Sequence, residues 1–270
     1  MQINKLFSVF FIISIIVSLA YSQEGSFKIG NIKYDYNNLE FSFSEGPADV
    51  TFKIGKFSLS TANTSAGFSQ NGSGDMNIGP SKVQIQNVHL DAYNRTTREN
   101  VKFDLGTVRF DLNQFTFDLN NFGNTPPEDI AFNMKFSANN IVLDLSQFNS
   151  FPPDVQQIFD QIGQIDKLAL NRATITTSYN SSKQFRFDVD GMTSLANIKV
   201  TVAATVDEMY PERTQFQACT LTISNLSTEV NNMIGMIQAQ TGYPIPMANG
   251  SITFDVKDML NAGQNPFGGF

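Results

Sequence analysis

Apolar and polar residues alternate through most of this chain, most clearly in FDLGTVRFDLNQFTFDL, residues 103–119. A β-strand turns successive side chains to opposite faces, so this alternation predicts strands with one buried face. The sequence therefore predicts a β-dominated chain that forms a large antiparallel sheet. Eight other segments show the same pattern: 26–44, 49–61, 82–103 (with a hairpin turn around Asn94 and Arg95), 130–145, 167–180, 184–191, 197–206 and 215–224.

The tripeptide Phe-Asp-Leu occurs three times in residues 103–119, each time seven residues further on. An odd spacing places successive copies on alternate faces of a straight strand, so the chain must turn or bend. One solution is a three-strand meander with turns at Gly106-Thr107 and Asn113-Gln114, which we favour. It places Arg109 opposite both Asp104 and Asp118, and Lys102 opposite Asp111. The other solution is one long strand bent by bulges at Gly106 and Asn113.

Two segments have helical instead of strand periodicity. Within residues 151–168 apolar residues recur at helical spacing after Pro152 and Pro153, and a second such segment spans 226–242. Ser227 is the expected N-cap of the second helix and Gly242 its stop. We expect both helices to lay their apolar stripes on the dry face of the sheet. The predicted fold class is therefore α+β and β-dominated, a curved antiparallel sheet packed on two amphipathic helices.

The first 22 residues have the features of a secretory signal peptide, with Lys5 before an apolar run and small residues at Ala20 and Ser22. We expect cleavage before Gln23, one β-rich domain over 23–260, a flexible Gly-rich tail over 261–270, and an extracellular protein. The net charge is -7, and the cations are scattered. This composition argues against nucleic acid as a partner and predicts that any membrane contact is transient and apolar.

The sequence carries few signs of catalysis or metal binding. His89 is the single histidine and lies in an alternating segment, which favours an ordinary strand residue over a catalytic base. One histidine and one cysteine are too few for a zinc site, and Cys219 is expected to be an inert thiol on the core face of a strand. We therefore predict no enzymatic activity, no cofactor and no metal.

A helix followed by Tyr243-Pro244-Ile245-Pro246 and a strand from Ile252 forms the end of the predicted domain. This order resembles the end of the tubular lipid-binding (TULIP) domains, the superfamily of bactericidal/permeability-increasing protein. The resemblance covers about thirty residues. It implies a curved sheet around helices that leaves an apolar tunnel for the acyl chains of a lipid. Two departures are the single cysteine, which cannot form the disulfide frequent in that family, and the missing closing strand.

We therefore expect a secreted, non-enzymatic binding protein for a lipid or another hydrophobic small molecule, held in an apolar cavity between sheet and helices. Flexible Met side chains suit the wall of such a cavity. The alternative is a structural or adhesive extracellular β-protein in which the same residues fill a solid core. The expected cavity-lining residues are Phe151, Phe159, Ile162, Val230, Met233, Ile234, Met236 and Ile237.

Six Asn-X-Ser/Thr sequons predict glycosylation at surface positions, because the chain enters the secretory pathway. They are Asn63, Asn71, Asn94, Asn180, Asn225 and Asn249.

Overall fold

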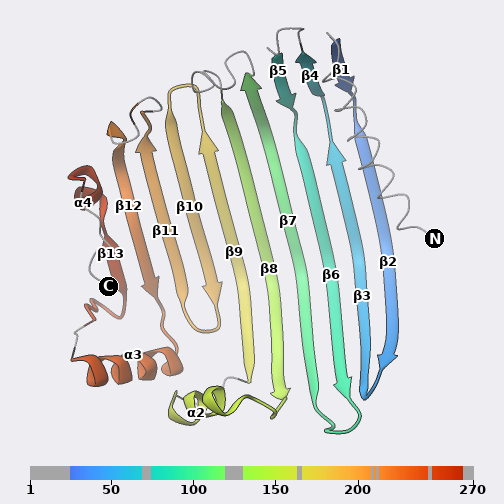
Figure 1. Ribbon diagram of the computed structural model, residues 1–270, viewed down its shortest axis with the longest axis vertical. Helices are drawn as coiled ribbons and strands as arrows, with labels where there is room; N and C mark the ends of the chain where they lie inside the picture. Colours follow the sequence, from blue (N-terminus) through green and yellow to red (C-terminus); the bar gives the residue numbers. More distant parts are fainter. Residues whose placement is uncertain are drawn as a thin grey trace.

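The structure is a computed structural model of the chain, and it describes residues 25–68, 74–118, 130–162, 166–207, 210, 213–242 and 245–263. Within these residues thirteen strands form a single antiparallel sheet, as the alternation predicts (Figure 1). The strands are β1 (Gly25–Ile29), β2 (Ile32–Glu45), β3 (Ala48–Thr61), β4 (Thr64–Phe68), β5 (Gly74–Ile78), β6 (Ser81–Asn94), β7 (Asn100–Asp118), β8 (Ala131–Gln147), β9 (Lys167–Tyr179), β10 (Gln184–Thr193), β11 (Asn197–Thr205), β12 (Gln215–Ser224) and β13 (Ile252–Asp255).

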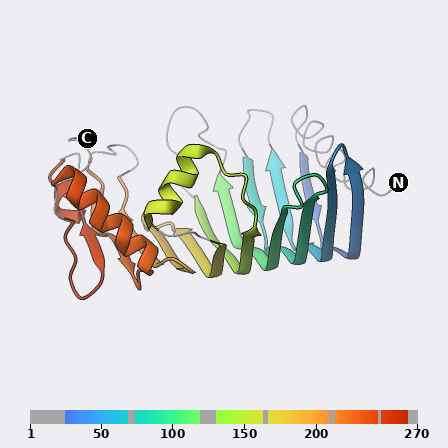
Figure 2. The same cartoon turned by 90° about the horizontal axis from the view of Figure 1, so that it is seen from below.

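Across the middle of the sheet the strand order is β2-β3-β6-β7-β8-β9-β10-β11-β12-β13. Three strands are short: β1 precedes β2 in the chain, and β4 and β5 lie between β3 and β6. They pair as β1-β4-β5-β7. The Ser, Gly and Asn content of residues 61–79 predicts an exposed loop. The structure instead places strands β4 and β5 at residues 64–68 and 74–78 of this segment. Figure 2 shows the strands in one row, and the sheet is not curled.

Residues that pair across neighbouring strands form rows that cross the sheet from edge to edge. One row is apolar at every position, and the next residue of each strand belongs to a row that is polar at every position. The apolar row is Tyr34, Leu59, Val83, Phe110, Phe136, Ile175, Val189, Val200, Leu221 and Phe254. The polar row is Lys33, Ser60, Lys82, Asp111, Lys135, Thr176, Asp188, Thr201, Thr220 and Asp255. Because neighbours in a row share a face, the sheet has one apolar and one polar face.

One row is different, because the pairing skips one residue in each of six neighbouring strands. We call it the Asn/Gly line, and its members are Asn38, Gly55, Asn87, Gly106, Asn140 and Asn171. Asn38, Asn87 and Asn140 have left-handed backbones, with φ of 57°, 53° and 53°. Asparagine tolerates this conformation better than other residues with a Cβ atom. Like a β-bulge, such a residue offsets the two-residue alternation by one position.

The glycines of the line make room for the asparagines of the next strand. A Cβ atom added to Gly55 would lie 2.8 Å from Cβ of Asn87, and one added to Gly106 would lie 3.0 Å from Cβ of Asn140. Both distances are shorter than an ordinary carbon–carbon contact of about 3.5–4.0 Å. A left-handed Asn on one strand therefore requires Gly beside it on the strand before.

The Asn/Gly line explains the seven-residue spacing of Phe-Asp-Leu. The favoured meander was wrong: Asn100–Asp118 is one strand, β7, and its offsets lie at Gly106 and at Asn113. The interval from Phe103 to Phe110 contains the offset at Gly106, so both phenylalanines fall in rows of the apolar face. The side chain of Phe117 lies outside the described residues. Arg109 consequently does not face Asp104 or Asp118. It forms an ion pair with Asp111 of the same strand, at 2.5 Å.

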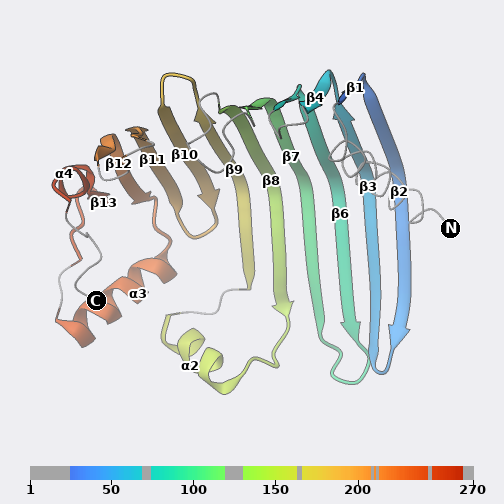
Figure 3. The same cartoon turned by 45° about the horizontal axis from the view of Figure 1, so that its top comes forward.

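The two predicted helices are present, but they do not cover the sheet. They are α2 (Pro153–Ile162) and α3 (Thr228–Thr241), and α3 has Ser227 as its N-cap and Gly242 as its C-cap, as predicted. Both lie beyond the strand ends in Figures 1 and 3, and they contact each other. A third helix, α4 (Lys257–Asn261), contacts β12.

The expected curvature of the sheet around the helices was therefore wrong. The connections keep the helices at the end of the sheet. β8 and β9 are hydrogen-bonded neighbours, so the segment that contains α2 starts and finishes at the same end, and α2 is only ten residues, or about 15 Å, long. Likewise, α3 begins four residues after Ser224 ends β12.

Few side chains are fully enclosed in this single layer. Among the described residues, no large side chain has less than 2% of its surface exposed. Four of the seven buried hydrophobic residues are alanines, since small side chains are the most easily covered by their neighbours within one layer. The seven are Ala66, Val88, Ala138, Ala196, Ala204, Ile234 and Ile252.

Candidate functional site

The apolar face of the sheet is the most extensive candidate site in the described part of the chain. Besides the row of ten defined above, it carries three more apolar rows, and no charged residue occurs in any of them. These rows are Tyr36, Phe57, Ile85, Val108, Ala138, Ala173, Gly191, Ile198, Ile223 and Ile252; Leu39, Ile54, Val88, Leu105, Ile141 and Leu170; and Phe41, Phe52, Leu90, Phe103, Leu143 and Leu168. The second of these rows meets the first across the Asn/Gly line.

Large apolar side chains on this face remain open to solvent. Phe254 is 45% exposed, Phe41 is 44% exposed and Phe110, near the middle of the sheet, is 36% exposed. Exposed apolar patches beyond a few hundred Å² are rare on soluble monomers and mark interaction sites. The apolar face is therefore chemically suited to a hydrophobic ligand or an apolar protein surface.

Aromatic pairs fix the orientation of side chains at the β2–β3 end of the face. Phe41 and Phe52 are stacked, with ring centroids 6.3 Å apart. Tyr34 and Phe57 meet edge to face at the same separation. Pairs of this kind add about 0.5–1.5 kcal/mol beyond the burial of their area. This end of the face therefore presents ordered rings to a ligand.

The opposite face holds the charged side chains, most of them paired. Lys53 Nζ lies 2.9 Å from Glu40 Oε1, and Arg186 Nε lies 2.6 Å from Asp188 Oδ2. One of its rows alternates in sign over four strands: Asp91, Lys102, Asp144 and Lys167. Opposite charges across a sheet attract, so this face is stable in water without a partner.

Hydrogen bonds and neighbouring charges shift several pKa values on the polar face. The Ser146 hydroxyl donates to Asp144 and, together with the charge of Lys167, lowers the pKa of this carboxyl. The neighbouring Ser58 hydroxyl lowers the pKa of Asp35, and so does Lys33, whose Nζ lies 3.1 Å from Asp35 Oδ2. Each shift favours the charged form, which is typical of solvated ion pairs and not of a general acid.

The structure places the predicted cavity-lining residues near the helices and not on the sheet. Ile234 is buried on α3, and Ile237 on the same helix is 39% exposed. Val230, Met233 and Met236 are half-buried on α3. The ring of Phe151 meets Phe148 edge to face, with centroids 4.9 Å apart. The side chains of Phe159 and Ile162 lie outside the described residues.

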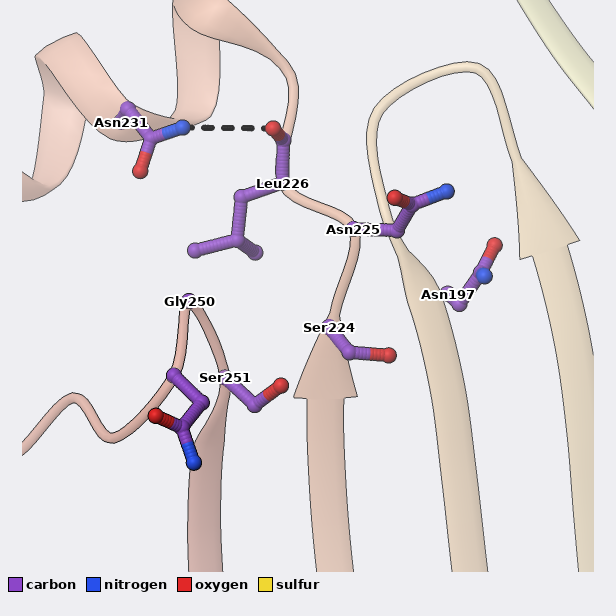
Figure 4. A pocket seen from close by; sticks show the side chains of 8 residues that line it. Asn197, Ser224, Asn225, Leu226, Asn231, Gly250 and Ser251 are labelled. Carbon is purple, nitrogen blue, oxygen red and sulfur yellow. Dashed lines mark hydrogen bonds between the residues drawn. The ribbon is translucent and has the colours of Figure 1, made fainter.

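A cavity of about 630 Å³ opens at the end of the sheet where α3 begins, and its wall is polar (Figure 4). Asn231 donates from Nδ2 to the carbonyl of Leu226 at 3.2 Å there. None of the six predicted residues whose side chains the structure describes lines this cavity. Sequence reasoning did not find it because its wall comes from three separate turns. The lining residues are Asn197, Ser224, Asn225, Leu226, Asn231, Asn249, Gly250 and Ser251.

Two predicted glycosylation sites, Asn225 and Asn249, line this cavity, and both are exposed with left-handed backbones. Asn63 and Asn180 are also exposed, whereas Asn94 is half-buried. The side-chain oxygen of Asn94 accepts from the backbone N–H of Thr96 and of Thr97 in the predicted β6–β7 hairpin turn. Asn71 lies outside the described residues.

The structure places the two residues with the most reactive side chains in ordinary strand positions. His89 lies on the polar face, with Nδ1 2.6 Å from Asp104 Oδ1. Cys219 faces Val202 and is half-buried. Burial and the charge of Asp255 raise the pKa of its thiol, which lowers the thiolate fraction. Among the described residues, no three His, Cys, Asp or Glu side chains are grouped to hold a metal ion.

Comparison of the chain with protein-family models, curated proteins and solved structures finds no match. The resemblance of residues 230–260 to the TULIP domains therefore stays a prediction. Of the helices that the structure describes, none combines the length and the apolar character needed to span a membrane.

Proposed function

We propose that this protein is a secreted, non-enzymatic binding protein that holds a lipid or another hydrophobic molecule on the apolar face of its sheet. One observation carries the proposal: an unbroken apolar row crosses ten strands, and no second layer of described residues covers it. The TULIP resemblance supports the same ligand class. The proposed location differs from the expected one, because α2 and α3 lie beyond the strand ends.

The energetics favour binding of an acyl chain to such a surface. Burial of a dozen CH2 groups contributes roughly 10 kcal/mol at about 0.8 kcal/mol each, before the entropy of association is subtracted. The apolar rows carry no charge, so an acyl chain desolvates no ion there. The polar face offers charged pairs and Thr side chains instead, and it is the face expected to stay in water.

The test is to purify the secreted protein, extract it with organic solvent and analyse the extract by mass spectrometry. We expect a lipid in stoichiometric amount, and uptake of a fluorescent fatty acid by the delipidated protein. Phe110→Glu places a charge in the centre of the apolar face and should reduce uptake at least tenfold. Ser137→Glu on the polar face of the neighbouring strand is the matched control.

A clean extract together with no uptake by the folded protein would contradict the proposal. It would favour the structural or adhesive alternative.

A further inference from the structure

We propose that a second copy of this chain covers the apolar face, so that two sheets pack face to face as a symmetric dimer. This inference rests on the proposed function, because it names the partner that closes the same surface around the ligand. Its basis is the size of the face, the shape of its central rows and the state of the sheet edges.

The apolar face is far larger than one lipid can cover. Ten strands about 4.8 Å apart span roughly 43 Å, and strands of about twelve residues are roughly 40 Å long, so the face measures about 1,700 Å². One acyl chain is about 15 Å long, since two chains span the hydrocarbon core of a bilayer, and it is no wider than one strand spacing. Most of the face would stay exposed around a single ligand.

A second copy matches this area. Two such faces in contact bury about 3,400 Å² in total, which lies in the range of obligate homodimers. Sheets pack face to face about 10 Å apart when both are open and only gently twisted, and this sheet is not curled. A twofold axis in the plane of the interface brings the same face of both copies together, as an isologous interface requires.

The centre of the face has a ridge and a hollow side by side. Phe110 and Phe136 are neighbours in one row, whereas the next apolar row has Ala138, Ala173 and Gly191 on adjacent strands. A twofold axis that lies in the interface, parallel to these two rows and midway between them, places Phe136 of each copy over Ala138 of the other. This arrangement provides the interdigitation that packed sheets need.

Pairing of two copies through the β2 edge is disfavoured by a local feature of that edge. Asn38, Asn87 and Asn140 lie on strands that run in one direction, and the last two lean over Gly55 and Gly106 of the strand before. By the same geometry the side chain of Asn38 projects off the free edge of β2. A strand added there would need glycine opposite Asn38, and a second β2 offers asparagine.

Charged residues and four of the six predicted glycosylation sites leave the apolar face free for a second copy. None of the four apolar rows contains a charged residue, so no charge is buried where these rows meet a second copy. The sequons at Asn94 and Asn180 lie in turns between strands, and Asn225 and Asn249 lie beyond the end of the sheet. Glycans at these four positions therefore extend from the rim and not from the rows.

Sedimentation equilibrium of the deglycosylated, full secreted protein tests this inference. We expect twice the mass of one chain at roughly 1 µM. Phe136→Glu should weaken the dimer at least a hundredfold, whereas Ser137→Glu, the next residue on the polar face, should leave it unchanged. Circular dichroism confirms that each variant is folded. Phe41→Glu, at an exposed position on the face, provides a second variant if Phe136→Glu unfolds.

The outcomes separate this inference from the proposed function. A monomer that still carries lipid overturns the dimer and leaves lipid binding intact. A dimer with a clean extract supports the inference and removes the ligand. A dimer that Phe136→Glu leaves intact overturns the face-to-face arrangement, because an unpaired charge at the centre of such an interface is not tolerated.

Discussion

Substitution of Gly55 by alanine tests whether the Asn/Gly line holds the sheet together. The added Cβ would lie 2.8 Å from Cβ of Asn87, an overlap of about 0.7–1.2 Å relative to an ordinary carbon contact. Neither atom can rotate away, because each is fixed to its own backbone, so two strands must shift. Overpacking of this kind costs about 1–3 kcal/mol, and we expect about 2 kcal/mol for Gly55→Ala.

The assay is urea unfolding followed by circular dichroism, with thermal melting as a second readout. A loss of about 2 kcal/mol corresponds to a Tm lower by roughly 4–8 °C for a domain of this size. Gly30→Ala is the matched control, because an added Cβ there has no atom within 4 Å. Asn87→Gly removes the opposing Cβ and keeps the left-handed backbone accessible. The double variant Gly55→Ala/Asn87→Gly should therefore recover most of the loss.

The double-mutant cycle isolates this contact, since neighbouring residues that share a contact show coupling of about 0.5–3 kcal/mol. The reasoning is refuted if Gly55→Ala is as mild as Gly30→Ala. It is also refuted if the effects of the two substitutions simply add.

Three further predictions concern the edge, one pH-sensitive contact and the thiol. Asn38→Gly removes the side chain that projects off the edge of β2, so light scattering should show faster aggregation than for Asn87→Gly. Glu99 Oε1 accepts from the backbone N–H of Asn149 at 2.8 Å, and hydrogen bonds from Thr97, Ser150 and Asn149 lower its pKa. The stabilisation that ionised Glu99 contributes is therefore fully present above pH 4.5 and is lost as the pH falls through the lowered pKa. In that pH range, hydrogen exchange at the backbone amide of Asn149 should rise in the parent protein and not in Glu99→Gln. Burial raises the pKa of Cys219, so iodoacetamide at neutral pH should modify it more slowly in the folded than in the unfolded protein; equal rates would contradict its position on the apolar face.

The strands could be predicted from the sequence because each carries its own alternation, and α3 because Ser227 and Gly242 mark its ends. The Asn/Gly line also has a sequence signal, which the analysis of single segments missed. In β6 the apolar positions change from odd numbers at Ile85 to even numbers at Val88. The same change of phase occurs in each neighbouring strand. Comparison of the strands with one another would have favoured bulges over the meander. A hairpin turn in one segment does not explain why the apolar positions change between odd and even numbers at the same row in every neighbouring strand.

The candidate site was harder to predict than the strands. Periodicity shows that a strand has a dry face, but not what covers it, because the covering layer is remote in the sequence or absent from it. The helices were assigned to that face because they were the only other apolar surfaces in the chain. The short connections to α2 and α3 argue against this, since a helix that follows β12 after three residues begins at the strand end.

The offsets also explain how strands as long as β7 serve a single apolar face. Its 19 residues span about 60 Å, and over that length a regular twisted sheet turns its face progressively away. An offset at Gly106 and another at Asn113 divide the strand into segments of about six residues, each with its apolar positions in phase with its neighbours. A chain that needed only a stable sheet could use shorter strands. A surface for a large apolar partner requires that one face stays apolar across both offsets. If that partner is a second copy of the chain, the secreted protein in solution has twice the mass of one chain.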